Sequence, residues 1–465
     1  AATQTAWLTG MFLWGILFFI KPRPRLVRTP LDIALWAFFG WSVISSVFSY
    51  APLISLDKLR NVALFLIFYF VINNIRTKRA VYFLALALIF STMVNVVWTP
   101  IERLIGRGVE IHGVKPESPL AKAYLEEGDT LLEMDGKKIR TPEELLAQIE
   151  QKESVKVKFY RPDFYYPVEV KRENLLGGAT AMEKLGIGSW KKSRNWRSSG
   201  FYGHYTTYAE VLQLIASLAF GIFIAFLTQW RSGAKTRGLT IILFFCLAGM
   251  SFALLFTVTR ASQLAFMISA FTIVLLGASR KMFLALLAIA LPLAIGGLIF
   301  LQTSREVGFF DPKDESIRWR QTVYREGFDL WTQNARHLFL GVGMDSIKLY
   351  AKEWRLFDEG KLPMGHFHST PLQLLVERGL PALLLWFWIV WIYGRLLIRG
   401  ISDSKFQISN SKLDRGILLG CLGGLVGFFT SGLVHYNLGD AEVAMVFFLL
   451  MGLAVKIARK NEESM

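Results

Sequence analysis

Two histidines, His366 and His368, stand just before a segment whose sequence predicts the start of a helix. Thr370 suits the N-cap, Pro371 the first helical position and Gln373 the third, a pattern typical of a capping box. The free N–H groups and the dipole of a helix N-terminus favour an anion and disfavour a charged imidazole. A neutral histidine beside an anion site is suited to general-base chemistry, so we predict that His368 is catalytic. Second candidates for the site are His204, Arg325, His366 and His435.

Three arginines lie close to segments that are apolar enough to cross a membrane. A charged side chain in mid-bilayer costs roughly 2.5–3.5 kcal/mol by insertion scales, so such residues indicate function by default. Arg197 precedes an apolar run, Arg260 opens another after a short turn, and Arg318 belongs to a polar segment. Guanidinium groups bind pyrophosphate oxygens through paired hydrogen bonds. We therefore predict that the three arginines converge on one external cavity that binds pyrophosphate.

Motifs for other chemistries are absent or weak. No histidine begins the His-Glu-x-x-His motif of a zinc metalloprotease. The Gly-x-Ser triplets 249–251 and 277–279 could hold a serine nucleophile, but such short matches are expected by chance in a glycine-rich membrane protein. Asp311, Asp314 and Glu315 form no Asp-x-Asp pair for a divalent cation. The sequence therefore favours neither a protease nor a metal site, and predicts no cofactor.

The composition predicts that an all-α polytopic membrane protein positions these residues. Hydrophobic residues make up 53% of the 465 residues, and charged residues only 19%, whereas a soluble domain is about one quarter charged. About 20 apolar residues cross a bilayer as a helix, and about eleven such runs follow one another along the chain. They cover residues 6–20, 31–48, 58–74, 80–99, 208–228, 238–256, 261–278, 281–301, 372–398, 414–434 and 440–458.

Lysine and arginine are enriched in every second connection between these runs. Because cytoplasmic loops carry this excess, the remaining connections are expected to face the periplasm of a Gram-negative inner membrane. The alternation accounts for most of the net charge of +16, and the scattered basic clusters do not predict nucleic-acid binding. The same alternation of basic and other connections places the first residue on the periplasmic side. We therefore expect one further span before it, which makes twelve in total. The basic connections are 21–28, 76–79, 231–237, 280–281, 395–415 and 456–460.

Residues 100–175 predict a small α+β domain inserted between the fourth and fifth spans. Strands are expected at 109–114, 130–134, 155–160 and 167–171, and a helix at 142–151. The runs Ser118-Pro119-Leu120-Ala121, Gly128-Asp129-Thr130-Leu131-Leu132 and Met134-Asp135-Gly136-Lys137-Lys138-Ile139 resemble the PDZ domain of bacterial envelope proteases.

This resemblance implies a groove that accepts an extended peptide by strand addition, and hence a periplasmic peptide or protein partner. Gly106-Arg107-Gly108 is a weak match to the carboxylate-binding loop of such domains. A spacer domain with an unused groove is the alternative. Residues 176–207 are interpreted as a connector.

The second external segment, 302–371, predicts an amphipathic helix on or near the membrane. Apolar or large residues recur at helical spacing, and Arg318 and Arg325 share another face. A solvated or snorkelling cationic face is the alternative reading of these two arginines. The recurring residues are Ile317, Gln321, Tyr324, Phe328 and Trp331.

The candidate residues also carry a resemblance to a known family. Arg260-x-x-x-Leu264, together with His368-Ser369 followed after nine residues by Gly379, resembles the paired motifs of the O-antigen ligase family. The runs 318–319, 341–346 and 372–380 are similar to the wider superfamily of O-antigen ligases and polymerases. The resemblance covers nearly the whole chain except the inserted domain, and Ala382 stands where the family pattern has a second glycine.

The resemblance implies a GT-C-like fold and a metal-independent, inverting glycosyltransferase. The donor would be an O-antigen-type glycan on undecaprenyl pyrophosphate, and the acceptor a sugar hydroxyl of lipid A-core at the periplasmic face. His368 would activate that hydroxyl, while Arg197, Arg260 and Arg318 would hold the leaving pyrophosphate.

Two other functions stay open on the sequence. The first is an O-antigen polymerase, which extends a glycan that is still on its lipid carrier. The second is a non-catalytic membrane scaffold or lipid-phosphate transporter with a peptide-binding domain. The predicted segments are 1–99, 100–175, 176–207, 208–301, 302–371 and 372–465.

Overall fold

The computed structural model of the chain separates into two compact units. The small unit comprises residues 94–205 and 255–258, and the helical unit comprises the rest. The structure describes residues 2–21, 24, 26–161, 167–230, 234–305, 315–360, 365–402 and 412–460.

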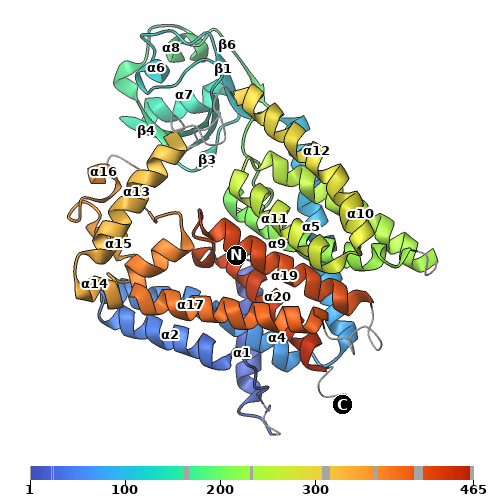
Figure 1. Cartoon of the computed structure of the whole chain (residues 1–465). Coiled ribbons are helices and arrows are strands. Elements are labelled where there is room, and N and C mark those ends of the chain that lie inside the picture. Colours follow the sequence, from blue (N-terminus) through green and yellow to red (C-terminus); the bar gives the residue numbers. More distant parts are fainter. Residues whose placement is uncertain are drawn as a thin grey trace. The chain divides into compact units, whose positions relative to one another are not determined.

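The helical unit consists of apolar helices and short connecting elements (Figure 1). Three of its long helices, α5, α9 and α10, have one end in the small unit. The helices are α1 (Ala2–Leu17), α2 (Asp32–Val47), α3 (Pro52–Val62), η1 (Ala63–Phe65), α4 (Leu66–Asn74), α5 (Lys78–Ile105), α9 (Tyr205–Leu227), α10 (Ala234–Phe256), α11 (Arg260–Gly277), α12 (Arg280–Arg305), α13 (Glu315–Thr332), α14 (Ala335–Leu340), α15 (Ser346–Tyr350), α16 (Leu356–Gly360), α17 (Thr370–Ser402), α19 (Lys412–Gly432), η4 (Asn437–Gly439) and α20 (Ala441–Lys460).

Within the described residues, 7 helices are long and apolar enough to cross a membrane, and two shorter apolar helices accompany them. The chain is therefore a mostly helical, multi-pass membrane protein by length and composition, while the expected count of eleven spans stays a prediction. The expected span 58–74 is divided, because α3 ends at Val62 and η1 separates it from α4. The polar residues of α3, among them the exposed pair Asp57 and Arg60, explain why the apolar run begins only after it.

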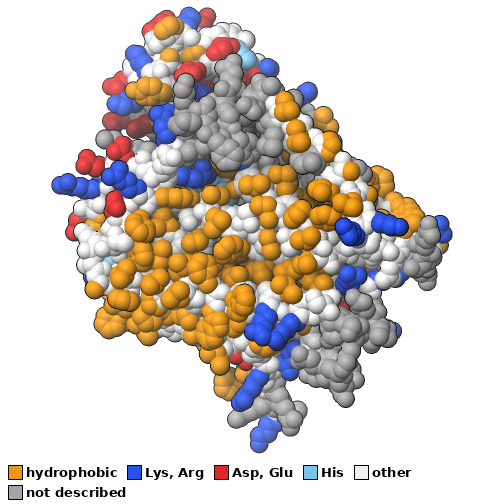
Figure 2. Space-filling view, in the orientation of Figure 1, with side chains coloured by type: hydrophobic (Ala, Val, Ile, Leu, Met, Phe, Trp, Pro, Cys, Tyr) orange, Lys and Arg blue, Asp and Glu red, His pale blue; other side chains and the backbone are white. Residues whose placement is uncertain are grey.

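Apolar side chains lie on the outside of the helical unit. Figure 2 shows hydrophobic side chains over the face that α2 and α17 form side by side. Ile33, Leu384 and Trp391 are all more than half exposed there. A broad exposed apolar surface of this kind indicates contact with lipid.

Close helix packing inside the helical unit depends on small residues. The helix α19 packs against α11 and α9. A Cβ at Gly221 of α9 would lie 2.1 Å from the backbone nitrogen of Gly420 on α19. Small residues at such crossings let helix backbones approach in membrane proteins.

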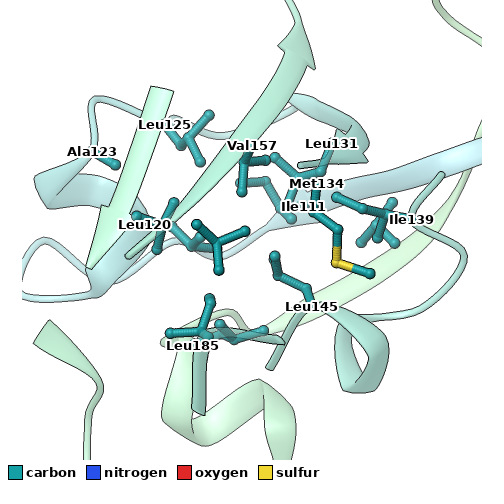
Figure 3. Packing of buried hydrophobic residues seen from close by; sticks show 14 of the residues in the cluster. Ile111, Leu120, Ala123, Leu125, Leu131, Met134, Ile139, Leu145, Val157 and Leu185 are labelled. Atoms are coloured by element: carbon teal, nitrogen blue, oxygen red, sulfur yellow. The ribbon is translucent and has the colours of Figure 1, made fainter. Parts of the chain in front are cut away.

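The small unit contains an antiparallel six-stranded sheet with the order β5-β4-β2-β1-β6, and β3 pairs with β2. Its buried core lies between the sheet and the helices α7 and α8, and includes Ile111, Leu145, Val157 and Leu185 (Figure 3). The elements are β1 (Arg107–His112), α6 (Pro119–Lys122), β2 (Thr130–Met134), β3 (Lys137–Lys138), α7 (Pro142–Gln151), β4 (Ser154–Tyr160), β5 (Pro167–Lys171), η2 (Arg172–Asn174), α8 (Ala181–Leu185) and β6 (Ser189–Ser193).

The four expected strands and the expected helix of this unit are present, with β1 and β4 beginning slightly earlier than predicted. The folded unit, however, continues past residue 175 into the segment interpreted as a connector. Leu185 and Ile187 are buried in its core, and β6 pairs with β1. The interpretation as a plain connector was wrong because an apolar pair and a sheet-completing strand both lie within it.

Candidate functional site

The N-terminus of α17 is capped by Ser369 and not by Thr370. The backbone N–H of Gln373 donates to the carbonyl of Ser369 at 2.8 Å, and Ser369 Oγ accepts from the N–H of Leu372 at 3.4 Å. Thr370 instead turns to another segment, where its N–H donates to the carbonyl of His435 at 3.0 Å. The predicted cap is therefore wrong by one residue, since tertiary contacts decided between two residues that both suit a cap.

His368 directly precedes this cap, as predicted, and its backbone is turned unusually. Its φ of 48° lies in the left-handed region, which is uncommon for residues other than glycine, although histidine adopts it more often than most. His366 Nδ1 accepts a hydrogen bond from the N–H of His368 at 3.2 Å. The two imidazole rings lie 4.1 Å apart between centroids. The turn thus brings both histidines together beside a helix N-terminus, where an uncharged imidazole is favoured.

The helix α13 packs against this turn. The indole of Trp319 meets the ring of His368 edge to face at 4.8 Å, and the hydroxyl of Tyr324 donates to the carbonyl of His368 at 3.0 Å. A Cβ at Gly327 would lie 2.8 Å from the ring of Phe367. The helix predicted in this segment is present, and it holds the backbone of the histidine turn in place.

The buried face of α13 differs from the predicted one. Val323, Gly327 and Leu330 are buried, whereas Gln321 and Phe328 are exposed. Glycine carries no apolar signal in a sequence, yet at position 327 it allows the close contact with Phe367. The side chain of Ile317 lies outside the described residues.

Arg318 and Arg325 are both exposed on α13. Arg325 Nε lies 3.9 Å from Asp329 Oδ2 on the same helix, in a solvent-exposed pair. Arg318 neighbours Trp319, so the backbone position of Arg318 is close to the histidine turn.

Arg260 is the first residue of α11. Arg197 belongs to the small unit, where its guanidinium lies 4.8 Å from the ring centroid of Tyr205 and its buried Nε has no hydrogen-bond partner within the described part of the chain. His204 stacks on Tyr205 in the same unit, with centroids 4.2 Å apart. The convergence of Arg197 and Arg260 with Arg318 on one cavity stays a prediction.

His435 takes part in a buried polar network. Its Nδ1 lies 2.9 Å from Glu210 Oε1 on α9, and both side chains are buried. Its carbonyl accepts from Thr370, as noted, while the Thr370 hydroxyl lies 2.9 Å from Asn437 Oδ1. His435 therefore anchors the start of α17 through its backbone.

The helix α17 is broken at Gly379. This residue has a φ of 74°, and a Cβ there would lie 2.0 Å from the carbonyl oxygen of Phe339, so only glycine fits. Two residues later, Pro381 has no N–H to bond the carbonyl of Glu377. The break therefore leaves carbonyl groups that need partners from outside the helix.

Those partners come from α2 and from the loop after α14. The N–H of Gly343 donates to the carbonyl of Glu377 at 2.9 Å, and the hydroxyl of Ser45 donates to it at 3.2 Å. The indole N–H of Trp41 donates to the carbonyl of Arg378 at 2.8 Å. The break is thus held on two sides, and the side chains of Glu377 and Arg378 line a cavity beside it.

This cavity, here called the α17 cavity, has a volume of about 150 Å³. Its walls include residues of α2, α3, α17 and α20. A wide apolar lining surrounds a cluster of charged and polar side chains, as is usual for a small-molecule site. The polar lining residues are Lys58, Asn61, Asp345, Lys348, His366, Glu377, Arg378 and Tyr436.

The charged groups of the cavity are arranged around Asp345. Lys58 Nζ lies 2.7 Å from Asp345 Oδ2, and Lys348 pairs with Asp345 Oδ1 at 3.2 Å. Glu377 Oε1 accepts a hydrogen bond from the N–H of Asp345 at 2.9 Å. Burial alone raises the pKa of Asp345, but the hydrogen bond from Lys58 and the charge of Lys348 outweigh it and hold this pKa below its usual value.

Sequence reasoning did not select Lys58, Glu377 or Arg378 as candidate site residues, although all three line the α17 cavity. The available signal was a pair of charges, Glu377 and Arg378, next to Gly379 and Pro381 inside an apolar run. Ionisable residues and helix breakers within a span indicate a functional site.

No group of three or more His, Cys, Asp or Glu side chains in the described parts of the chain is arranged to hold a metal ion. Asp311 and Asp314, considered above for a cation site, lie outside the described residues.

Two comparisons with known proteins bear on this site. The O-antigen ligase family model matches residues 245–387. This segment contains Arg260, Arg318 and His368, together with Arg325, His366 and the break in α17. The match supports a place in the O-antigen ligase superfamily and a role in ligation or polymerisation of lipid-linked glycans.

A stretch of 43 residues is 54% identical to the magnetosome formation protease MamE of Paramagnetospirillum magneticum. It covers 9% of this chain and 6% of that protein. The likeness is therefore local and leaves most of both chains unmatched.

Proposed function

We propose that the protein transfers an O-antigen-type glycan from undecaprenyl pyrophosphate to a sugar hydroxyl of lipid A-core, at the periplasmic face of the inner membrane. His368 takes the proton of the acceptor hydroxyl as that oxygen attacks the anomeric carbon. The bond from this carbon to the pyrophosphate oxygen breaks with inversion. Arg197, Arg260 and Arg318 stabilise the charge of the leaving pyrophosphate.

The observation that carries the proposal is the histidine turn before α17. It lies inside the segment that matches the O-antigen ligase family model, and its Nδ1-to-N–H bond and its contact with Trp319 fix the rings. A general base must be held within reach of the proton that it removes, and a fixed neutral imidazole meets this need. His366 and His435 remain second candidates for the base.

In vitro transfer with the purified full chain tests this proposal. The chain is reconstituted with a defined undecaprenyl-pyrophosphate glycan and with lipid A-core, and the modified lipid A-core is resolved by gel. We expect transfer by the unaltered protein and its loss in His368→Ala, while His112→Ala in the small unit serves as a matched histidine control. Normal transfer by a well-folded His368→Ala protein would refute the assignment of the base.

The same assay separates the ligase from the polymerase. The Arg260-x-x-x-Leu264 and His368 motif pair favours the ligase. Products in which several repeats stay on the carrier lipid, with unmodified lipid A-core, would favour the polymerase. A scaffold or lipid-phosphate transporter would keep its role in cells when His368 is replaced, and would form neither product.

A second role is proposed for the small unit, which resembles a PDZ domain in its sequence motifs. β6 is a terminal strand of the sheet, and no other strand of the described chain pairs with its outer edge. An extended peptide of a partner protein can add to such an edge. Replacing residues 107–193 with a Gly-Ser linker should then impair partner recruitment in cells and spare in vitro transfer. Loss of transfer by a well-folded deletion protein would contradict this division of roles.

A further inference from the structure

We propose that the α17 cavity binds a phosphate-class anion through Arg378 and Lys58. This inference rests on the proposed function, because the lipid-linked donor is the expected source of that anion. It differs from the proposed roles of Arg197, Arg260 and Arg318, since none of these three residues lines the cavity.

The state of Arg378 is the first argument. Its side chain is only 1% exposed, and a buried charge is costly unless it is fully paired. A guanidinium has five N–H donors, yet this one makes two long hydrogen bonds to described residues, at 3.3 Å to Ser42 Oγ and 3.4 Å to the Tyr436 hydroxyl, and lies 5.1 Å from the ring centroid of Phe38. Its Nε has no hydrogen-bond partner among the residues that the structure describes. Arg378 therefore has N–H donors that are available to a ligand.

The balance of charge in the cavity is the second argument. Lys58, Lys348 and Arg378 bring three positive charges, against the two carboxylates of Asp345 and Glu377. Asp345 is already paired with both lysines. An anion between Arg378 and Lys58 would complete the hydrogen bonds of the guanidinium and compensate the excess positive charge.

The fit of the ligand class is the third argument. A guanidinium fork and a lysine ammonium together match the oxygens of a phosphate group. The volume of about 150 Å³ suits a headgroup and not a whole lipid. The apolar walls, which include Phe65, Trp386 and Phe448, suit the first carbons of a prenyl chain. A prenyl pyrophosphate combines both parts.

The place of the cavity is the fourth argument. His366 lines it, and the ring of His366 lies 4.1 Å from that of His368. A phosphate bound at Arg378 would thus lie in a cavity that adjoins the proposed base. A broken helix beside a polar cavity is also the arrangement by which membrane proteins present charged groups to ligands at membrane depth.

Binding to the full chain in lipid nanodiscs tests the inference without any glycan transfer. The probes are farnesyl pyrophosphate, inorganic pyrophosphate and farnesol, measured by isothermal titration calorimetry. We expect farnesyl pyrophosphate to bind, and Arg378→Gln and Lys58→Gln each to weaken it about tenfold or more, since a hydrogen bond to a charged group is lost. Arg60→Gln is the matched control, because Arg60 lies on the same helix as Lys58 but is exposed and does not line the cavity.

The two sources of the anion give different results. Tighter binding of farnesyl than of inorganic pyrophosphate, dependent on Arg378 and Lys58, assigns the cavity to a lipid headgroup. Equal binding with the same dependence assigns it to the free anion. Farnesol binding as well as farnesyl pyrophosphate, or wild-type affinity in both the Arg378→Gln and Lys58→Gln proteins, would overturn the inference.

Control variants separate a loss of binding from a loss of folding. Arg378 is buried, so Arg378→Lys, which keeps the charge, is included together with a melting curve for each variant. Lys58 is partly exposed and its variant tests the site if Arg378 variants misfold. Charge-dependent binding without glycan transfer would sustain the inference and contradict the proposed function. Glycan transfer together with farnesyl pyrophosphate binding that does not depend on Arg378 and Lys58 would support the proposed function and contradict the inference.

Discussion

The small unit and the helical unit differ in how they place charged residues. In the small unit the core is apolar, and ion pairs such as Lys184 with Glu150 lie at the surface. In the helical unit the surface is apolar, and charges such as Asp414 and Arg378 lie in the interior. Water solvates an exposed charge, whereas a buried charge needs ion-pair or hydrogen-bond partners within the protein. An interior charge with unmet donors is therefore a sign of function, and in the helical unit Arg378 combines such a charge with the α17 cavity.

The largest expected effect is on catalysis. Replacing His368 with alanine should lower the rate of glycan transfer about 10²–10⁴-fold, the usual contribution of a general base. The initial rate of lipid A-core modification by the reconstituted protein is the measurement. A comparable loss in the His112→Ala protein, whose histidine lies in the small unit, would remove the distinction between the two regions.

The next effect is on the break in α17. Gly379→Ala should destabilise the protein by about 4 kcal/mol, because left-handed backbone is costly for alanine and the new Cβ meets the Phe339 carbonyl. A melting curve in detergent measures it. Gly136→Ala in the small unit is the control, since Gly136 also has a positive φ but open space around its Cβ position. Equal losses would show that the tight contact contributes nothing.

A buried ion pair should show a smaller effect. Asp414 is fully buried and accepts from Lys78 at 3.0 Å and from the Tyr82 hydroxyl at 2.7 Å. Asp414→Asn should cost about 3 kcal/mol, because it removes the buried carboxylate to which both Lys78 and Tyr82 donate. Denaturation in detergent is the measurement. If Asp414→Asn lowers the free energy of unfolding no more than the loss of an exposed ion pair does, the interior charges of the helical unit do not differ in energy from the surface charges of the small unit.

The acid dependence of stability should involve His337 on α14. Burial lowers the pKa of His337 below its usual value, with a partial offset from the hydrogen bond between its Nδ1 and the Leu330 carbonyl at 2.8 Å. The unfolded chain then binds a proton more readily than the folded one. Stability is thus full above about pH 6.5 and falls as the pH drops toward the lower folded pKa. Melting curves of His337→Gln should lack this component; an unchanged acid slope would contradict it.

The smallest effect concerns the surface of the small unit. Lys184 Nζ lies 2.8 Å from Glu150 Oε1 in a pair that is partly exposed on both sides. Lys184→Gln should change the free energy of unfolding by about 0.5 kcal/mol or less. Chemical denaturation measures it, with Glu150→Gln as the partner variant. If Lys184→Gln lowers the free energy of unfolding as much as Asp414→Asn does, Lys184 and Glu150 do not behave as a solvent-exposed pair.

The elements of the small unit could be predicted from the sequence because their signals are local. Thr141 and Pro142 mark the start of α7, and alternation marks β4. The strand β6 was missed, since the run 189–193 is short and basic and is defined by its pairing with β1. Its assignment needed the partner strand.

The site was only partly predictable for the same reason. The turn with His368 follows from nearby residues, but the choice of Ser369 over Thr370 depends on His435, which is far away in the sequence. The contact of Lys58 with Asp345 likewise joins two distant segments. No pattern within one run indicates which distant charge will meet Arg378.

The break in α17 also has a consequence for how the protein assembles in the membrane. The carbonyls of Glu377 and Arg378 receive hydrogen bonds from Ser45 and Trp41 of α2, some 330 positions earlier, as well as from the loop after α14. Unmet carbonyls are costly in lipid. The helix α2 must therefore wait, with these donors uncommitted, until the much later α17 docks beside it.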